Sequence, residues 1–203
     1  MLGVELANRV ACTRADCSPL KVNITSEVIA VFEKQWRILI GMLAAVVVCA
    51  FAAFAWDWGA PVQPPQTAGD RLAFAMRWLL LPALTLFAGI GLTANRRFLF
   101  AEAIDGQRHV ESHSFEINLR YNQNTLEQVV LATFAWTSLA LTLPTQDLGL
   151  IPRLAIVFCA GRVTFWLGYL YAPWARAFGM GLTAYPTFAA LVWLAWQLLN
   201  EFR

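Results

Sequence analysis

Long apolar segments are the feature that most restricts how this chain can fold. Five of them approach or exceed the roughly 20 residues that an α-helix needs to cross a bilayer. They are residues 38–56, 78–95, 115–143, 154–171 and 177–199. Because backbone amides find no water in lipid, spanning segments form helices or closed barrels, and these lengths fit helices. The sequence therefore predicts an all-α, integral membrane helical bundle with five spans.

Composition supports a membrane protein and excludes other classes. The chain of 203 residues is 59% hydrophobic and 14% charged, whereas soluble domains carry about 25% charged residues. Its formal net charge is only +2, and no basic patch interleaves with aromatic residues, so we expect no nucleic-acid partner. The four cysteines are scattered, which argues against a disulfide framework. We therefore expect membrane lipids as the main surroundings of the chain.

Basic residues set the expected orientation. Arginine and lysine are concentrated in residues 1–37 and 95–120, and the positive-inside rule places such segments in the cytoplasm. We therefore expect a cytoplasmic N-terminus, a cytoplasmic connection at residues 95–116 and a C-terminus on the opposite side. Residues 38–56 could also be a signal peptide, but this run is longer than a typical signal h-region. We interpret it as a retained transmembrane helix.

Other local signals are weaker. Residues 26–33 could form a short interfacial helix with Ser26 as its N-cap, and Pro82 falls in the first turns of the second apolar segment, where proline is tolerated. Cys12 and Cys17 have no second cysteine pair to complete a zinc site. His109 and His113 could share a metal on a helix, but two solvated loop histidines are the better interpretation. We expect no metal site.

Charged and amide side chains interrupt the third apolar segment. Arg120, Asn124 and Glu127 occupy positions i, i+4 and i+7, which places them on one face of a helix. Arginine can bind a carboxylate through two parallel hydrogen bonds, an amide donates and accepts, and glutamate accepts from an ammonium group. This face would suit a zwitterionic, peptide-like ligand. The alternative is a polar helix end in the headgroup zone, with Glu127 neutralised by a partner helix.

The fourth apolar segment contains Arg162, followed at helical spacing by Phe165, Trp166 and Tyr169. A charge near the bilayer centre costs at least a few kcal/mol, so it usually has a task. One interpretation makes this face a second wall of the same polar pocket. The alternative is a structural ion pair between Arg162 and Glu127 that only joins two helices.

The first of these motifs resembles a signature of the MAPEG superfamily, the membrane-associated proteins in eicosanoid and glutathione metabolism. The signature on the family's second helix is approximately R-A-H-x-N-x-x-E, which this chain matches at Arg120, Asn124 and Glu127. The chain departs from it at the histidine, which is Asn122 here, and at a second basic position, which is Gln123. With these departures we still expect glutathione binding. Whether the chain also catalyses a reaction of glutathione is the open point.

The second motif resembles the pattern on the family's third helix. There, G-R-V is followed by a tyrosine seven residues after the arginine, as in residues 161–163 and Tyr169. A later basic residue corresponds to Arg176, which alone would be a positive-inside anchor. A serine proposed as thiol activator in some members would fall on Ala177. The resemblance covers roughly residues 75–200. It depends on the two motifs together, which lie on consecutive helices at the separation that the family shows.

The resemblance implies a four-helix subunit that assembles as a homotrimer and binds glutathione between subunits near the cytoplasmic face. On that mapping, residues 1–70 are an N-terminal extension with an extra transmembrane helix, and residues 71–203 are the family domain. The implied contacts fall into two groups. Glutathione would bind Arg120, Asn124, Glu127, Arg162 and, from the adjacent subunit, Arg97, while Arg176 and Tyr169 would act on the thiol.

Three functions follow as hypotheses. The resemblance implies a glutathione-dependent transferase or peroxidase that acts on lipophilic electrophiles. The departures from the signature would equally suit a non-catalytic lipid-binding or scaffold member of the superfamily. A transporter that uses Glu127 and Arg162 as a relay is a third possibility, but the chain lacks paired broken helices in two repeats.

Overall fold

The computed structural model describes residues 24–54, 65–99 and 113–201, which form helices and contain no β-strand. The chain divides into two compact units, Met1–Glu33 and Lys34–Arg203, and the contacts described below lie within the second. The predicted all-α class is confirmed. The elements are α1 (Ile24–Phe54), α2 (Ala68–Leu99), α4 (His113–Thr142), the 3-10 helix η2 (Thr145–Gly149), α5 (Leu150–Tyr171) and α6 (Arg176–Glu201).

α1 and α2 begin well before the apolar runs that predict them, whereas α4, α5 and α6 match their predicted segments to within four residues. α1 begins at Ile24, so the expected interfacial helix is the start of α1, and Ser26 lies inside it rather than at its cap. α2 begins at Ala68, which puts Pro82 near its middle and not in its first turns. Backbone hydrogen bonding does not require apolar side chains. Helices therefore continue through polar residues that lie beyond the hydrocarbon core.

The connection expected at residues 95–116 is also shorter than predicted, because α2 continues to Leu99 and α4 begins at His113. Residues 100–112 lie outside the described residues, as do Cys12, Cys17 and His109. The metal-site interpretations that involve them stay predictions. The orientation in the membrane and the division expected at residue 70 also stay predictions.

Local hydrogen bonds explain where α2 begins and how it is tied to α4. The Thr67 hydroxyl accepts a bond of 3.1 Å from the Asp70 backbone N–H, and the Asp70 carboxylate accepts from the Thr67 backbone N–H at 3.3 Å. This reciprocal pair is a capping box. Next to it, Arg71 donates to the Leu143 carbonyl at 2.7 Å and to the Thr145 hydroxyl at 2.8 Å. Arg71 thus satisfies the C-terminal end of α4.

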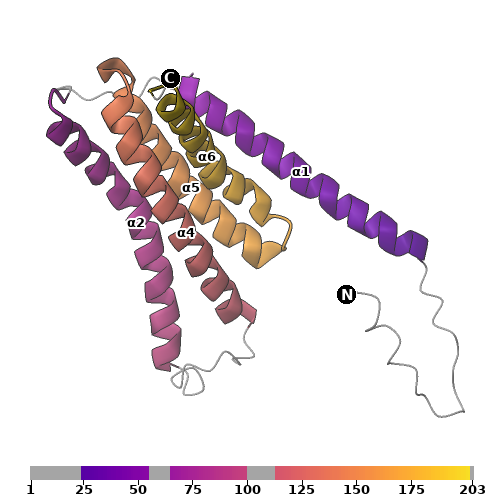
Figure 1. Ribbon diagram of the computed structural model, residues 1–203. Helices are drawn as coiled ribbons and strands as arrows, with labels where there is room; N and C mark the ends of the chain where they lie inside the picture. The colour runs from indigo at the N-terminus through magenta and orange to yellow at the C-terminus, as the bar shows by residue number, and fades with distance from the viewer. Residues whose placement is uncertain (1–23, 55–64, 100–112, 202–203) are drawn as a thin grey trace, which may run out of the picture. The chain divides into compact units, whose positions relative to one another are not determined.

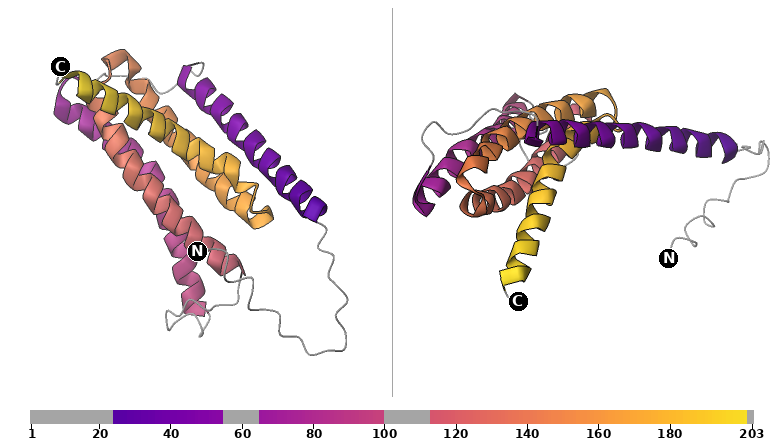
Figure 2. Two further views of the ribbon diagram at one scale, coloured as in Figure 1. Left: turned by 45° about the vertical axis from the view of Figure 1, so that its right-hand side comes forward. Right: turned by 90° about the horizontal axis from the view of Figure 1, so that it is seen from above.

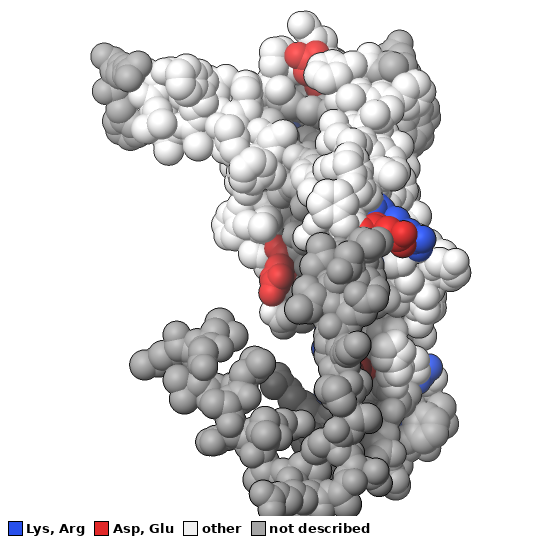
Figure 3. Space-filling model, turned by 90° about the vertical axis from the view of Figure 1, so that its right-hand side faces the viewer, with Lys and Arg blue, Asp and Glu red and all other residues white. Residues whose placement is uncertain are grey.

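The helices have the length and composition of membrane spans. α4 is as long as the others, but Glu116, Arg120 and Glu127 make its first half more polar. Among the described residues on the face drawn in Figure 3, charged side chains are sparse. The chain is therefore an integral membrane protein. The segments that are apolar and long enough to cross a bilayer are Val31–Phe54, Ala68–Phe98, Thr145–Tyr171 and Arg176–Glu201.

Two helix pairs dominate the bundle: α2 lies along α4, and α5 lies along α6 (Figures 1 and 2). The α5–α6 pair is held close by glycine. A Cβ on Gly179 would overlap the backbone nitrogen of Phe165 and lie 2.5 Å from the Gly161 carbonyl oxygen. Small residues permit such backbone approach between membrane helices. This approach fixes the register of α5 against α6, and thereby places the last turns of α5 beside the start of α6.

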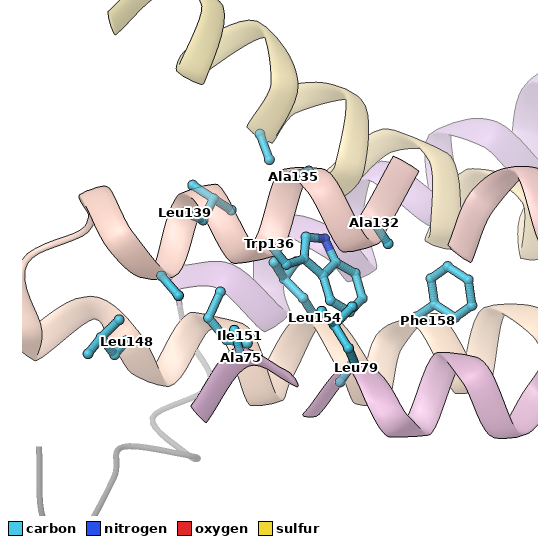
Figure 4. Close-up of a cluster of buried hydrophobic side chains, with 13 residues drawn as sticks. Ala75, Leu79, Ala132, Ala135, Trp136, Leu139, Leu148, Ile151, Leu154 and Phe158 are labelled. Carbon is cyan, nitrogen blue, oxygen red and sulfur yellow. The ribbon is translucent and has the colours of Figure 1, made fainter. Parts of the chain in front are cut away.

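The apolar core lies at the other end of these helices. Trp136 of α4 is 1% exposed and meets Phe158 of α5 edge to face, with ring centroids 5.8 Å apart. Leu79 of α2 and Leu154 of α5 pack around the indole (Figure 4). This cluster joins α2, α4 and α5, and it leaves the polar residues of α4 grouped toward the opposite end of the bundle.

Candidate functional site

A cavity of about 580 Å³ lies where the first half of α4 meets the turn between α5 and α6. That volume is within the range of about 300–1,000 Å³ typical of small-molecule sites. Its lining includes Arg120, Asn124, Tyr169 and Arg176, which we call the donor cluster, and the side chains of Trp174 and Tyr185 add an indole N–H and a second phenol. The remaining described lining residues are predominantly apolar, and none of the lining residues that the structure describes carries a carboxylate. Four of the seven predicted site residues thus share one cavity.

Tyr169 connects the two arginines of the donor cluster. Its hydroxyl oxygen accepts a hydrogen bond of 3.0 Å from Arg120, and the Arg176 guanidinium carbon lies 4.6 Å from the centre of its ring. Arg120 also forms an ion pair with Glu116 one turn earlier, but Glu116 does not line the cavity. Among the described residues, no acceptor takes the hydroxyl proton of Tyr169. The phenol is therefore available to donate to a ligand.

Asn124 is oriented by a residue behind it. Arg162 donates to the Asn124 side-chain oxygen at 2.9 Å and to the Thr125 hydroxyl at 2.7 Å. A guanidinium group can only donate, so the amide atom that faces Arg162 must be the oxygen. The NH₂ group of Asn124 is consequently left to the cavity. Arg162 acts here as a positioning residue.

Arg162 itself does not reach the cavity. It is 0% exposed, and its guanidinium carbon lies 4.3 Å from the Phe165 ring centre and 5.0 Å from that of Tyr121. Its Nε atom has no hydrogen-bond partner, and no ion pair joins it to Glu127 within the described part of the chain. The structural ion pair weighed as an alternative is therefore not formed. Two hydrogen bonds and two ring faces surround the charge instead.

The cavity presents donors without a matching acceptor carboxylate. Each member of the donor cluster offers N–H or O–H groups: two guanidinium groups, one amide and one phenol. Charge-assisted bonds from such groups to a carboxylate or phosphate are among the strong hydrogen bonds of proteins. The donor cluster can therefore bind an anionic group. Among the described lining residues, an ammonium group would find no carboxylate partner.

Glu127 and Arg97 lie elsewhere. Glu127 is exposed on α4 and accepts a hydrogen bond of 2.9 Å from Gln123. It follows Arg120 by about 10 Å along the helix axis, since an α-helix rises about 1.5 Å per residue. Arg97 is exposed in the last turn of α2 and does not line the cavity. The structure thus does not bring either residue to the donor cluster within one chain.

The positions that depart from the family signature have structural partners of their own. Asn122 donates to the Gly89 carbonyl at 3.1 Å and to the Thr93 hydroxyl at 2.8 Å, which ties α4 to α2. A Cβ on Gly89 would overlap the Asn122 side-chain oxygen, so a larger residue there would displace the Asn122 side chain. Ala177 lines the cavity and brings no hydroxyl to it. The chain therefore uses Asn122 for helix packing and offers no side-chain oxygen at residue 177.

Sequence reasoning missed part of the site. Ile38 and Met42 of α1 line the cavity. Trp166, which the sequence places on the face of Arg162, donates to the side-chain oxygen of Asn118 at 3.0 Å and so joins α5 to α4. No motif identifies Ile38 or Met42, because both are ordinary residues of an apolar span. The spacing of Gly41, Ala45 and Cys49 indicates that one face of α1 is packed, but it does not tell which helix or cavity that face meets.

Comparison with known proteins agrees with the resemblance. Residues 74–199 match the model of the MAPEG family. The chain is 29% identical over 148 residues to transmembrane protein 79 of Mus musculus and 28% identical over 147 residues to that of Bos taurus. Each alignment covers 71% of this chain and 35% of the relative, so the chain spans about a third of the length of these curated relatives. No solved structure matches.

The family match includes both polar motifs and the whole donor cluster, with Arg120 and Asn124 on α4 and Tyr169 and Arg176 on α5 and α6. It also includes α4, α5 and most of α2 and α6, and it leaves α1 outside. Because the match extends over more than half of the sequence, the chain belongs to the MAPEG family.

Proposed function

We propose that this membrane protein binds glutathione at the donor cluster and presents its thiolate to lipophilic electrophiles. The observation that carries the proposal is the convergence of Arg120, Asn124, Tyr169 and Arg176 on one cavity without a carboxylate. Glutathione has two carboxylate groups that such donors can bind. Family membership supports the same ligand. The lipophilic second substrate would enter from the bilayer.

Arg176 and Tyr169 are the candidates for thiol activation. An ordinary thiol has a pKa near 8.5, so little thiolate exists at neutral pH. A nearby guanidinium group favours the anion. The thiolate sulfur would attack an electrophilic carbon, a C–S bond would form, and the leaving group would depart with its electron pair, while the thiol proton goes to water. With a lipid hydroperoxide, two glutathione molecules would be oxidised to the disulfide as the peroxide becomes an alcohol and water.

The proposal includes a homotrimer with the site between subunits. Glu127 and Arg97 are both exposed in the single chain, so a neighbouring subunit can bring them to the ligand. In that arrangement Glu127 would accept from the ammonium group of glutathione, which has no partner in the cavity of one subunit. Chemical cross-linking of the protein in lipid nanodiscs tests the assembly, and a dominant trimer band is expected.

Replacing Arg176 with alanine is expected to weaken glutathione binding at least about tenfold, because one charge-assisted hydrogen bond contributes about 1.5–3 kcal/mol. Isothermal titration of glutathione into the detergent-purified protein measures this change. Arg77→Ala removes an exposed arginine of α2 that does not line the cavity, so it serves as the matched control. No binding of millimolar glutathione to the wild-type protein would refute the proposal.

A non-catalytic role as a lipid-binding or scaffold member is the second candidate. Ala177 supplies no hydroxyl for thiol activation, and the relatives share a name, transmembrane protein 79, that states no enzyme activity. This candidate predicts that the protein binds glutathione or lipid but turns over neither an aryl halide nor a lipid hydroperoxide. Turnover that Arg176→Ala abolishes would instead support the enzyme.

A further inference from the structure

α1 covers one side of the cavity. Ile38 and Met42 line the cavity, and they are also 36% and 37% exposed. Each of these residues therefore touches the cavity on one side and the outer surface of the bundle on the other. The family match begins at residue 74, after α1 has ended at Phe54. α1 is thus a wall, added to the matched region, between the cavity and the lipid.

The end of α1 is anchored in the bundle by buried contacts. Ala52 is 5% exposed and belongs to a buried cluster with Val157 of α5 and Leu182 of α6. Arg153 of α5 donates to the Ala53 carbonyl at 3.1 Å, which satisfies one of the carbonyls left unpaired at the end of a helix. Moving this end of α1 would uncover apolar side chains and break this hydrogen bond.

The part of α1 beside the cavity, residues 34–44, is held differently, and we call it the cover segment. Every residue from 34 to 40 is exposed. The Arg37 guanidinium carbon lies 5.2 Å from the ring centre of Trp174, in the turn between α5 and α6, and an exposed contact of this kind is weak. Elements with few buried contacts are those that open most readily in a folded protein. The cover segment is therefore the part of α1 that can leave the bundle at the lowest cost.

We propose that α1 is a movable cover of the cavity. The cover segment swings away from α6 about the anchored end at Ala52, and the contact of Arg37 with Trp174 latches it closed. In the closed state Ile38 and Met42 separate the cavity from the lipid, and in the open state molecules dissolved in the lipid reach the α6 side of the lining. The proposal concerns access to the cavity and does not depend on whether glutathione binds there.

A disulfide bond between residues 41 and 177 can lock the cover closed. A Cβ built on Gly41 lies 3.7 Å from the Ala177 Cβ, within the roughly 3.5–4.5 Å that a disulfide requires. Gly41→Cys and Ala177→Cys are combined and oxidised with copper phenanthroline. The native thiols are first removed by Cys12→Ala, Cys17→Ala, Cys49→Ala and Cys159→Ala. Failure of this bond to form would contradict the closed position of α1.

A third cysteine reports access to the cavity from the lipid. Ala184 lines the cavity, so Ala184→Cys is added and the full chain in phosphatidylcholine nanodiscs is treated with the lipid-soluble reagent N-cyclohexylmaleimide. Mass spectrometry of peptides measures labelling at residue 184. We expect labelling without the 41–177 disulfide and loss of labelling with it.

Two controls separate closure from other effects of these changes. Gly41→Ser with Ala177→Ser has nearly the same bulk but cannot form the bond, so residue 184 should label as in the unlocked protein. Ala189→Cys lies on an exposed part of α6 that does not line the cavity, and it should label equally with and without the disulfide. Equal labelling of residue 184 in the locked and unlocked proteins overturns the proposal.

Arg37→Ala tests the latch without the engineered disulfide, and so keeps the proposal testable if the cysteine pair disturbs the packing. When opening is fast relative to labelling, the rate follows the population of the open state. Loss of an exposed cation–π contact then predicts labelling of residue 184 that is about two- to fivefold faster. Lys34→Ala removes another exposed cation of α1 and should leave the rate unchanged.

Labelling that Arg37→Ala leaves unchanged overturns the latch. A separate glutathione titration of the wild-type protein tells whether the proposed function fails on its own.

Discussion

Replacing Arg162 with alanine is expected to lower the free energy of unfolding by about 3 kcal/mol or more, because hydrogen bonds to charged groups contribute about 1.5–3 kcal/mol each. The variant loses the bonds to Asn124 and Thr125 and the contact with the Phe165 ring. It also frees the Asn124 amide to rotate, so its NH₂ group no longer has to face the cavity. Glutathione affinity should therefore fall about tenfold, or about 1.4 kcal/mol.

Thermal unfolding in detergent micelles and calorimetric titration measure the two effects of Arg162→Ala separately. Arg162→Lys is the matched variant, because it keeps the positive charge but lacks the fork that reaches both Asn124 and Thr125. It should fall between the wild type and the alanine variant in stability. An alanine variant that unfolds and binds as the wild type does would contradict the positioning role of Arg162.

Gly179→Ala is expected to be the most damaging change of a single methyl group. Its Cβ would overlap the backbone nitrogen of Phe165, and the other close atom is the backbone oxygen of Gly161. Backbone atoms cannot rotate away as side-chain ends can, so α5 and α6 must separate. Overpacking of this kind typically destabilises by about 1–3 kcal/mol, and we expect the upper end of that range or more.

The separation should also open the cavity, since Tyr169 and Arg176 lie on either side of the same α5–α6 contact. Gly91→Ala is the control, because a Cβ there meets no atom within 4 Å. Unfolding temperatures in micelles provide the comparison. Equal values for Gly179→Ala and Gly91→Ala would show that the close approach of α5 and α6 is not required.

Hydropathy predicts the helices of this protein and the ends of α4, α5 and α6 to within four residues, but it does not predict where α1 and α2 begin. Lys34 and Arg37 lie inside α1, and Asp70 and Arg71 lie in the first turn of α2. A hydropathy criterion ends a span at such residues, whereas the backbone continues its hydrogen bonds through them. α4 is the opposite case: the sequence predicts residues 115–143 and the helix is His113–Thr142, although its first half is polar.

The candidate site could be predicted in part. Helical spacing groups Arg120 with Asn124, and the family resemblance adds Tyr169 and Arg176, which the structure places on the same cavity. Spacing alone does not tell which members of a face reach a cavity. Glu127 shares the face of Arg120 but lies two turns farther along α4. Arg162 is buried where α5 packs against α4 and does not reach the cavity.

The contribution of α1 was the least accessible to sequence reasoning. Its lining residues are common aliphatic side chains, and only the regular spacing of Gly41, Ala45 and Cys49 indicates a packed face. The partner of that face cannot be read from α1 alone, because it depends on the glycine at residue 181 of α6. Such pairings arise from tertiary packing rather than from local pattern.

The central claim is that the donor cluster recognises carboxylate groups, and the chemistry of the ligand tests it most directly. Glutathione and its glycyl ethyl ester differ by one carboxylate charge and can be titrated calorimetrically into the same wild-type preparation. Loss of one charge-assisted hydrogen bond predicts binding of the ester at least about tenfold weaker than that of glutathione. Equal affinities for the acid and the ester would contradict the claim.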